Sequence, residues 1–157
     1  MLSEHYEHYK GGGQERNVSL KVPLYGFREA FDSMNEHQPA MRELHYNEST
    51  QIDGFRLTPF PVKYDSIMPF GFVLENENER VGCVFNGKLT KSSLTAIQWC
   101  SRLYLANCLR PGDTEARPEV KARRLTAVYP SFQEEETFLR QNMSSNWRVI
   151  QMGLMAR

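Results

Sequence analysis

The stretch from Ile52 to Gly87 constrains the fold of this 157-residue chain more than any other part. One apolar run extends from Ile52 to Val62 and ends at a polar corner. Two further apolar runs, residues 70–75 and 80–85, flank a polar turn at residues 76–79. Short apolar runs bounded by polar turn residues are typical of β-strands, and the last two runs indicate a hairpin. The stretch therefore predicts three consecutive strands.

Other parts of the chain predict helices. Phe27, Ala30, Phe31 and Met34 recur at helical spacing, and Ser131-Phe-Gln-Glu134 is a capping-box pattern. The predicted helices cover about residues 27–35, 40–44, 90–100, 118–124 and 131–143. Residues 1–19 are polar and rich in glycine, which predicts a flexible loop.

Composition excludes several classes of protein. The chain has 19 basic and 19 acidic residues, so no global field attracts nucleic acid or an anionic membrane. No apolar run approaches the ~20 residues that cross a bilayer, and the N-terminus does not look like a signal peptide. Cys83, Cys100 and Cys108 are odd in number and lie in apolar contexts, which predicts buried free thiols and a cytoplasmic protein. We expect a single domain.

Several segments resemble the metallo-β-lactamase-fold hydrolases. The run Pro59-Phe-Pro-Val-Lys-Tyr64 resembles a "PxPxxH" strand, and residues 80–87 resemble the strand that ends in "SDTxG" or "TDTG". Residues 21–29 are similar to a "PVYGxxE" segment, and residues 102–108 and 148–154 are similar to two later strands. Within the superfamily, the chain most resembles the cyclic phosphodiesterase of phosphonate breakdown and the tRNA 3′-processing endonuclease.

The resemblance implies a site in which most metal ligands are replaced. The family's histidine and bridging aspartate fall at Tyr64 and Asn86, its late histidine falls at Gly153, and an additional histidine maps to Pro130. If Gly11 is aligned with the glycine of "HxHxDHxxG", the four ligand positions hold Ser3, His5, Glu7 and His8. A two-metal hydrolase needs ligands on both ions and an open position for water. The resemblance thus implies that two-metal catalysis is lost. One weakly bound zinc or manganese ion at His5, Glu7 and His8 stays open as an alternative.

The resemblance also implies a fold that is only part of the family's. The expected class is α+β, a half sandwich with a mixed β-sheet and flanking helices over residues 1–157, because the strands that precede "HxHxDH" are missing. An apolar sheet face left open to water is a liability for a monomer. We therefore expect a homo-oligomer or a protein partner that covers this face.

A basic cluster is the remaining candidate site. Arg117, Lys121 and Arg124 would share one face of a helix, where they could contact phosphates or an acidic partner. Glu115 and Glu119 lie nearby, so a solvated helix face is the alternative interpretation.

Three functions follow from these observations. The favoured one is a non-catalytic relative of the hydrolases that acts by binding, as a subunit, an inhibitor or a scaffold. The second is a metal-dependent phosphodiesterase with a rearranged site. The third is a protein that holds a nucleotide or another phosphorylated ligand in the old cleft, where Tyr64, Asn86, His5 and His8 would line the site.

Overall fold

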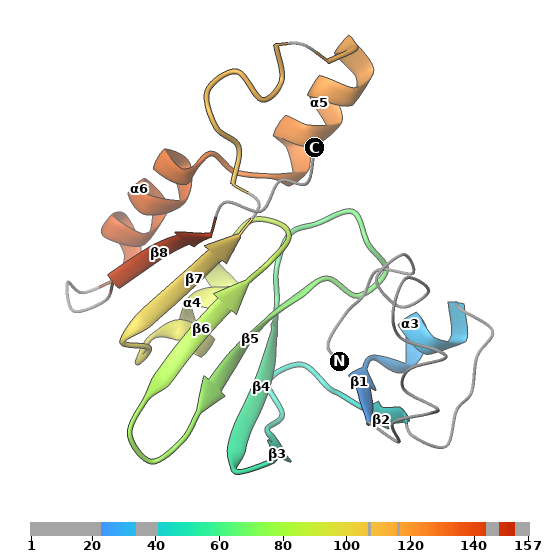
Figure 1. Cartoon of the computed structure of the whole chain (residues 1–157), viewed down its shortest axis with the longest axis vertical. Helices are drawn as coiled ribbons and strands as arrows, with labels where there is room; N and C mark the ends of the chain where they lie inside the picture. Colours follow the sequence, from blue (N-terminus) through green and yellow to red (C-terminus); the bar gives the residue numbers. More distant parts are fainter. Residues whose placement is uncertain (1–22, 34–40, 107, 116, 144–147, 153–157) are drawn as a thin grey trace.

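The computed structural model describes residues 23–33, 41–106, 108–115, 117–143 and 148–152. A six-stranded sheet in the order β3-β4-β5-β6-β7-β8 forms the centre, and β1 and β2 form a small separate sheet (Figure 1). The strands are β1 (Leu24–Gly26), β2 (Met41–Glu43), β3 (Thr50–Ile52), β4 (Phe55–Pro61), β5 (Phe70–Glu75), β6 (Arg80–Val84), β7 (Arg102–Ala106) and β8 (Arg148–Met152). The helices are α3 (Arg28–Ser33), α4 (Lys91–Ile97), α5 (Glu119–Val128) and α6 (Phe132–Asn142).

The central sheet is mixed. Strands β3 to β6 pair antiparallel, because the connections between them are too short for a parallel crossover, and the predicted hairpin at residues 76–79 joins β5 to β6. Strands β7 and β8 then add in parallel after the helical connections. The α+β class and the mixed sheet with flanking helices that the sequence predicts are confirmed.

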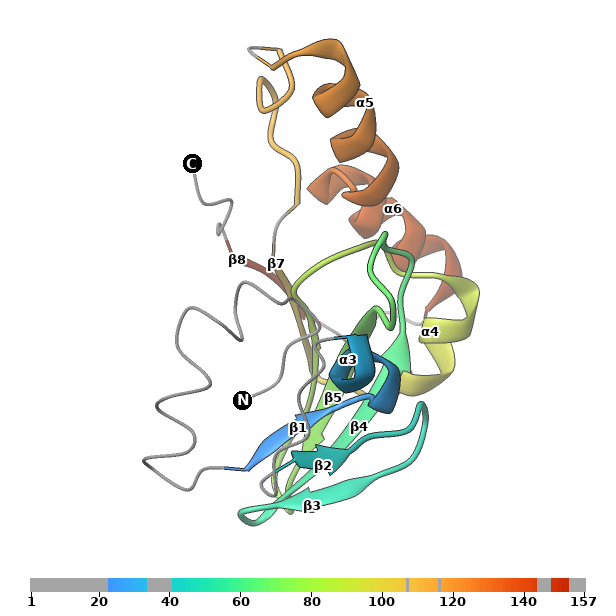
Figure 2. The same cartoon turned by 90° about the vertical axis from the view of Figure 1, so that its right-hand side faces the viewer.

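Helices α4 and α6 cover one face of the sheet (Figure 2). Phe60, Ile97 and Leu139 are fully buried in the core between these helices and the sheet. A second apolar cluster lies on the opposite face, where Phe27 and Leu44 pack against Leu57 and other sheet residues. The segment β1–α3–β2 therefore covers part of that face near β4 and β5.

The starts of α4 and α6 follow from local signals. Ser131 accepts a hydrogen bond from the backbone N–H of Glu134, and the Glu134 carboxylate accepts one from the Ser131 N–H, so the predicted capping box is present. Thr90 and Ser93 form the corresponding box at the start of α4.

The predicted helix at residues 40–44 is wrong, because Met41–Glu43 is strand β2. This strand pairs in parallel with β1, and the N–H of Leu44 donates to the carbonyl oxygen of Gly26 at 2.8 Å. Pairing with a distant segment outweighs the weak local helical preference of a short, mixed sequence.

Cys83, Cys100 and Cys108 are buried free thiols, as predicted. Burial raises the pKa of each thiol to about 11, so all three are neutral at physiological pH. None of the helices in the described part of the chain combines the length and the apolar character needed to cross a membrane.

Candidate functional site

The candidate site forms where the ends of β4 and β6 meet the start of α6. The polar corner after β4 pairs with the segment after β6 through two backbone hydrogen bonds between Lys63 and Lys88, each 2.9 Å long. These bonds bring Tyr64 next to Asn86, although the two residues lie on different strand ends. The sequence-predicted positions Tyr64 and Asn86 are thus brought together.

Gly87 allows the two segments to approach this closely. Its φ is +92°, and a Cβ atom added there would lie 2.7 Å from the Lys63 carbonyl oxygen and 3.0 Å from the Tyr64 Cβ. Both the backbone conformation and the lack of space favour glycine.

Three side chains form a hydrogen-bonded cluster in the site. The hydroxyl oxygens of Tyr64 and Tyr129 are 2.7 Å apart, and their ring centroids are 5.4 Å apart. The Tyr129 hydroxyl donates to the Oδ1 atom of the buried Asn86 at 3.5 Å. Burial, and next the hydrogen bond to Tyr129, raises the pKa of Tyr64 well above that of an exposed tyrosine. Tyr64 is therefore a neutral phenol at physiological pH.

Two further polar contacts fasten α5 beside this cluster. The Nε atom of Arg124 donates to the Asp65 carboxylate at 2.7 Å, and the Lys88 ammonium donates to the carbonyl oxygen of Thr126 at 2.9 Å. Of the residues in α5, only Val128 is buried. The helix extends away from the sheet (Figure 1), so its position depends largely on polar groups.

The predicted basic cluster differs from the arrangement expected of one helix face. Arg117 lies before α5 rather than within it, and its guanidinium donates to the carbonyl oxygen of Asp113 at 2.9 Å. Arg124 is paired with Asp65, while Lys121 is exposed. Arg123 pairs with Glu119 one turn earlier. Much of the positive charge of this region is therefore matched by nearby acceptors.

The described residues of the site do not fit a catalytic metal ion. Zinc and related ions are held by neutral imidazoles, thiolates or carboxylates, usually three or more per ion. Here the converging groups are two phenols and an amide, and each already takes part in the cluster. No group of three or more His, Cys, Asp or Glu residues able to hold a metal ion occurs among the residues that the structure describes. Ser3, His5, Glu7, His8 and Gly153 lie outside those residues.

The prediction from sequence missed Tyr129, which bonds both other members of the cluster. It also missed Glu135, a buried carboxyl in α6. Glu135 precedes the fully buried Leu139 by one helical turn, so the apolar face of the helix already included this acidic residue. Nothing comparable in the local sequence pointed to Tyr129.

Similarity to known proteins is found in the fold and not in the sequence. No protein-family model matches the sequence, and no curated protein resembles it significantly. Among solved structures, the metallo-β-lactamase-fold protein YhfI from Bacillus subtilis is similar at a TM-score of 0.59 and 10% identity, over 96% of this chain and 73% of YhfI. Igni18, a metallo hydrolase from Ignicoccus hospitalis, is similar at 0.56 and 12%, over 97% of this chain and 75% of Igni18.

A third similar structure is the short form of human tRNase Z. Its TM-score is 0.50 at 11% identity, over 86% of this chain and 64% of the human protein. Identities this low establish the fold and not the chemistry. The chain therefore has a metallo-β-lactamase fold, with a hydrogen-bonded pair of tyrosines and an asparagine where three loops of that fold converge.

Proposed function

We propose that this chain acts by binding a protein partner, either a second copy of itself or another chain, and not by metal-dependent hydrolysis. The observation that carries the proposal is the cluster of Tyr64, Tyr129 and Asn86. Hydrolysis by a metal centre needs ligands that hold the ion and leave a position for water. Two phenol side chains that are hydrogen-bonded to each other, one of them also to an amide, support a structural use of this position instead.

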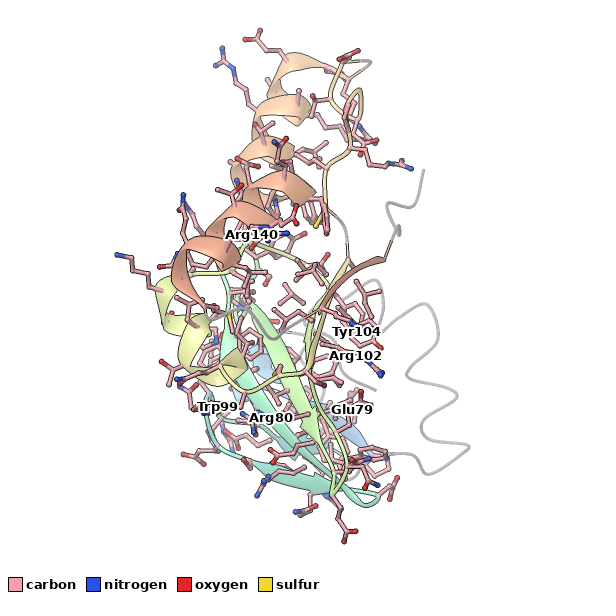
Figure 3. The ribbon with its side chains drawn as sticks, turned by 90° about the vertical axis from the view of Figure 1, so that its left-hand side faces the viewer. Glu79, Arg80, Trp99, Arg102, Tyr104 and Arg140 are labelled. Atoms are coloured by element: carbon pink, nitrogen blue, oxygen red, sulfur yellow. The ribbon has the colours of Figure 1, made fainter. Side chains whose placement is uncertain are left out.

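The surface that we propose for binding is the part of the sheet face turned away from α4 and α6 that the segment β1–α3–β2 does not cover. Pairing register places Phe72, Cys83, Tyr104 and Ile150 in one row across β5 to β8. Figure 3 has the side chains of Tyr104 and Arg102 on this face and Trp99 on the helical side. Tyr104 and Ile150 are only partly buried, and Phe85, whose ring lies 5.7 Å from that of Phe72, is 40% exposed. Partly exposed apolar and aromatic side chains gathered on one face are typical of protein interfaces.

Metal content tests the loss of catalysis. We expect protein purified without a histidine tag or chelator to contain well under one zinc, manganese or iron ion per chain by mass spectrometry. Its melting temperature should not change when EDTA is added, because there is no bound metal to remove. A metal ion present at a hundred times its Kd would stabilise the folded protein by ~2.7 kcal/mol, and EDTA would abolish that gain. Two equivalents of metal, with a melting temperature that falls on chelation, would overturn the proposal and favour a phosphodiesterase. One equivalent that is lost when His5 or His8 is replaced would favour the rearranged single-metal site.

Molecular mass tests the binding surface. We expect the protein to exceed its monomer mass in light scattering at micromolar concentration, and Phe85→Glu to reduce that mass because a buried unpaired carboxylate is costly at an interface. Val120→Glu is the matched control, since Val120 is 82% exposed on α5, away from this face. A wild-type protein that is strictly monomeric would contradict self-association. An equal effect of both substitutions would show that Phe85 is not specific to the interface.

A further inference from the structure

Glu135 is a buried acid with one unsatisfied oxygen. The residue lies in α6 and is 4% exposed. Its Oε1 atom accepts a hydrogen bond from the backbone N–H of Leu89 at 2.9 Å. Its Oε2 atom is buried and has no hydrogen-bond partner in the described part of the chain. A buried polar atom without a partner is unusual in a folded protein and costs free energy when its group is charged.

The charged groups around Glu135 compensate its charge only weakly. Lys88, on the segment before α4, attracts a negative charge, but its ammonium already donates to the Thr126 carbonyl oxygen. Glu134, on the same helix, repels it, and so would the Cys108 thiol after β7 if that thiol were ionised. Burial outweighs the hydrogen bond from Leu89 and the attraction of Lys88, and raises the pKa of Glu135 from 4.5 to about 7.

The hydrogen bond between Glu135 and Leu89 lies close to the candidate site. Leu89 follows Asn86 by three residues, and the segment 86–89 is held at both ends by residues around the start of α6. Tyr129 bonds Asn86 before the helix begins, and Glu135 bonds Leu89 within its first turns. A change at Glu135 therefore acts on the same segment that carries Asn86.

We propose that the Glu135 carboxyl is a proton-sensitive latch, which holds α6 against residues 86–89 when it is neutral and loosens this contact when it is charged. The neutral acid keeps the bond to Leu89 and places no net charge in the interior. The carboxylate places a charge on a buried oxygen that lacks a hydrogen-bond donor in the described part of the chain, and local opening of the contact lets water solvate it.

The sign of the pH effect follows from linkage. Below about pH 4.5 the carboxyl is neutral in both the closed and the opened state, so pH has no effect on the balance. Between about pH 4.5 and 7 the opened state loses its proton first, and rising pH favours opening. Above about pH 7 both states are charged and the balance is constant again.

Hydrogen exchange at the Leu89 amide tests the latch. After correction for the intrinsic exchange rate, we expect its opening constant to rise by up to about tenfold per pH unit between pH 5 and 7 and then to level off. In Glu135→Gln the same amide should show no such rise, because the amide side chain does not titrate. The Ser101 amide, which donates to the Arg80 carbonyl oxygen at 2.9 Å, serves as an internal reference. The same slope at Leu89 in both proteins would overturn the proposal.

Direct titration of the Glu135 carboxyl in the wild-type protein tests the latch even if Glu135→Gln does not fold. In carbon-13 spectra of wild-type protein labelled at the glutamate carboxyls, the chemical shift of one resonance should change with pH with a midpoint near pH 7, against 4.5 for an ordinary glutamate. That resonance should be absent from Glu135→Gln. If every glutamate in the folded wild-type protein titrates below about pH 5.5, Glu135 is charged under ordinary conditions and the latch does not exist.

Discussion

Replacing Gly87 by alanine should destabilise the protein by about 2–5 kcal/mol and separate the two tyrosines of the site. Two costs add at this position. A non-glycine residue at a φ of +92° costs about 1–2 kcal/mol, and a Cβ atom 2.7 Å from the Lys63 carbonyl oxygen forces the backbone apart at a further ~1–3 kcal/mol. Urea denaturation measures the total loss, and near-ultraviolet circular dichroism reports the change around Tyr64 and Tyr129.

Gly54→Ala is the matched control for Gly87→Ala. Gly54 has a similar φ of +84°, but an added Cβ would meet nothing within 4 Å. In Gly54→Ala the free energy of unfolding should fall only by the cost of the backbone conformation, about 1–2 kcal/mol, and the near-ultraviolet spectrum should not change. If both variants lose the same stability, the close approach of the loops after β4 and β6 is not a constraint.

Phe60→Ala should lower the free energy of unfolding by about 3–5 kcal/mol. Phe60 is fully buried in β4, and its ring fills the space beside Gly71, where an added Cβ would lie 2.6 Å from the ring. Truncation thus removes both apolar burial and the contacts of a packed ring, and the rigid sheet cannot collapse into the space. The midpoint of urea denaturation should fall in proportion to this loss, and the dependence of the unfolding free energy on urea concentration should not change.

Phe55→Ala tests whether this loss comes from burial. Phe55 occupies the same strand but is 45% exposed. Its truncation should cost less than about 1 kcal/mol, since surface changes away from special features are small. A loss for Phe55→Ala equal to that for Phe60→Ala would mean that strand formation, and not the core, limits stability at β4.

The elements that could be predicted from sequence are those with a strong local pattern. The strand runs 70–75 and 80–85 and the capping box at Ser131 each carry their signal within a few residues, and each is confirmed. The segment 40–44 carries no such signal, and its conformation as β2 depends on pairing with β1.

The candidate site shows the limit of this reasoning more clearly. The positions of Tyr64 and Asn86 could be placed because the strands around them are well defined by sequence. Their partner Tyr129 is 65 residues from Tyr64, and a contact over that distance depends on how α5 and α6 pack. The unsatisfied oxygen of Glu135 is likewise a property of the packed interior and has no local signature.

The central strands precede helix α6 in the sequence, and this order has a consequence during translation. Strands β4, β5 and β6 are local neighbours, so they can pair as soon as they leave the ribosome. The core that they share with α6 is not complete until Leu139 has been made, and β8 follows later still. A nascent chain therefore presents a sheet whose apolar face is not yet covered by α6, which is the kind of surface that chaperones hold until translation is complete.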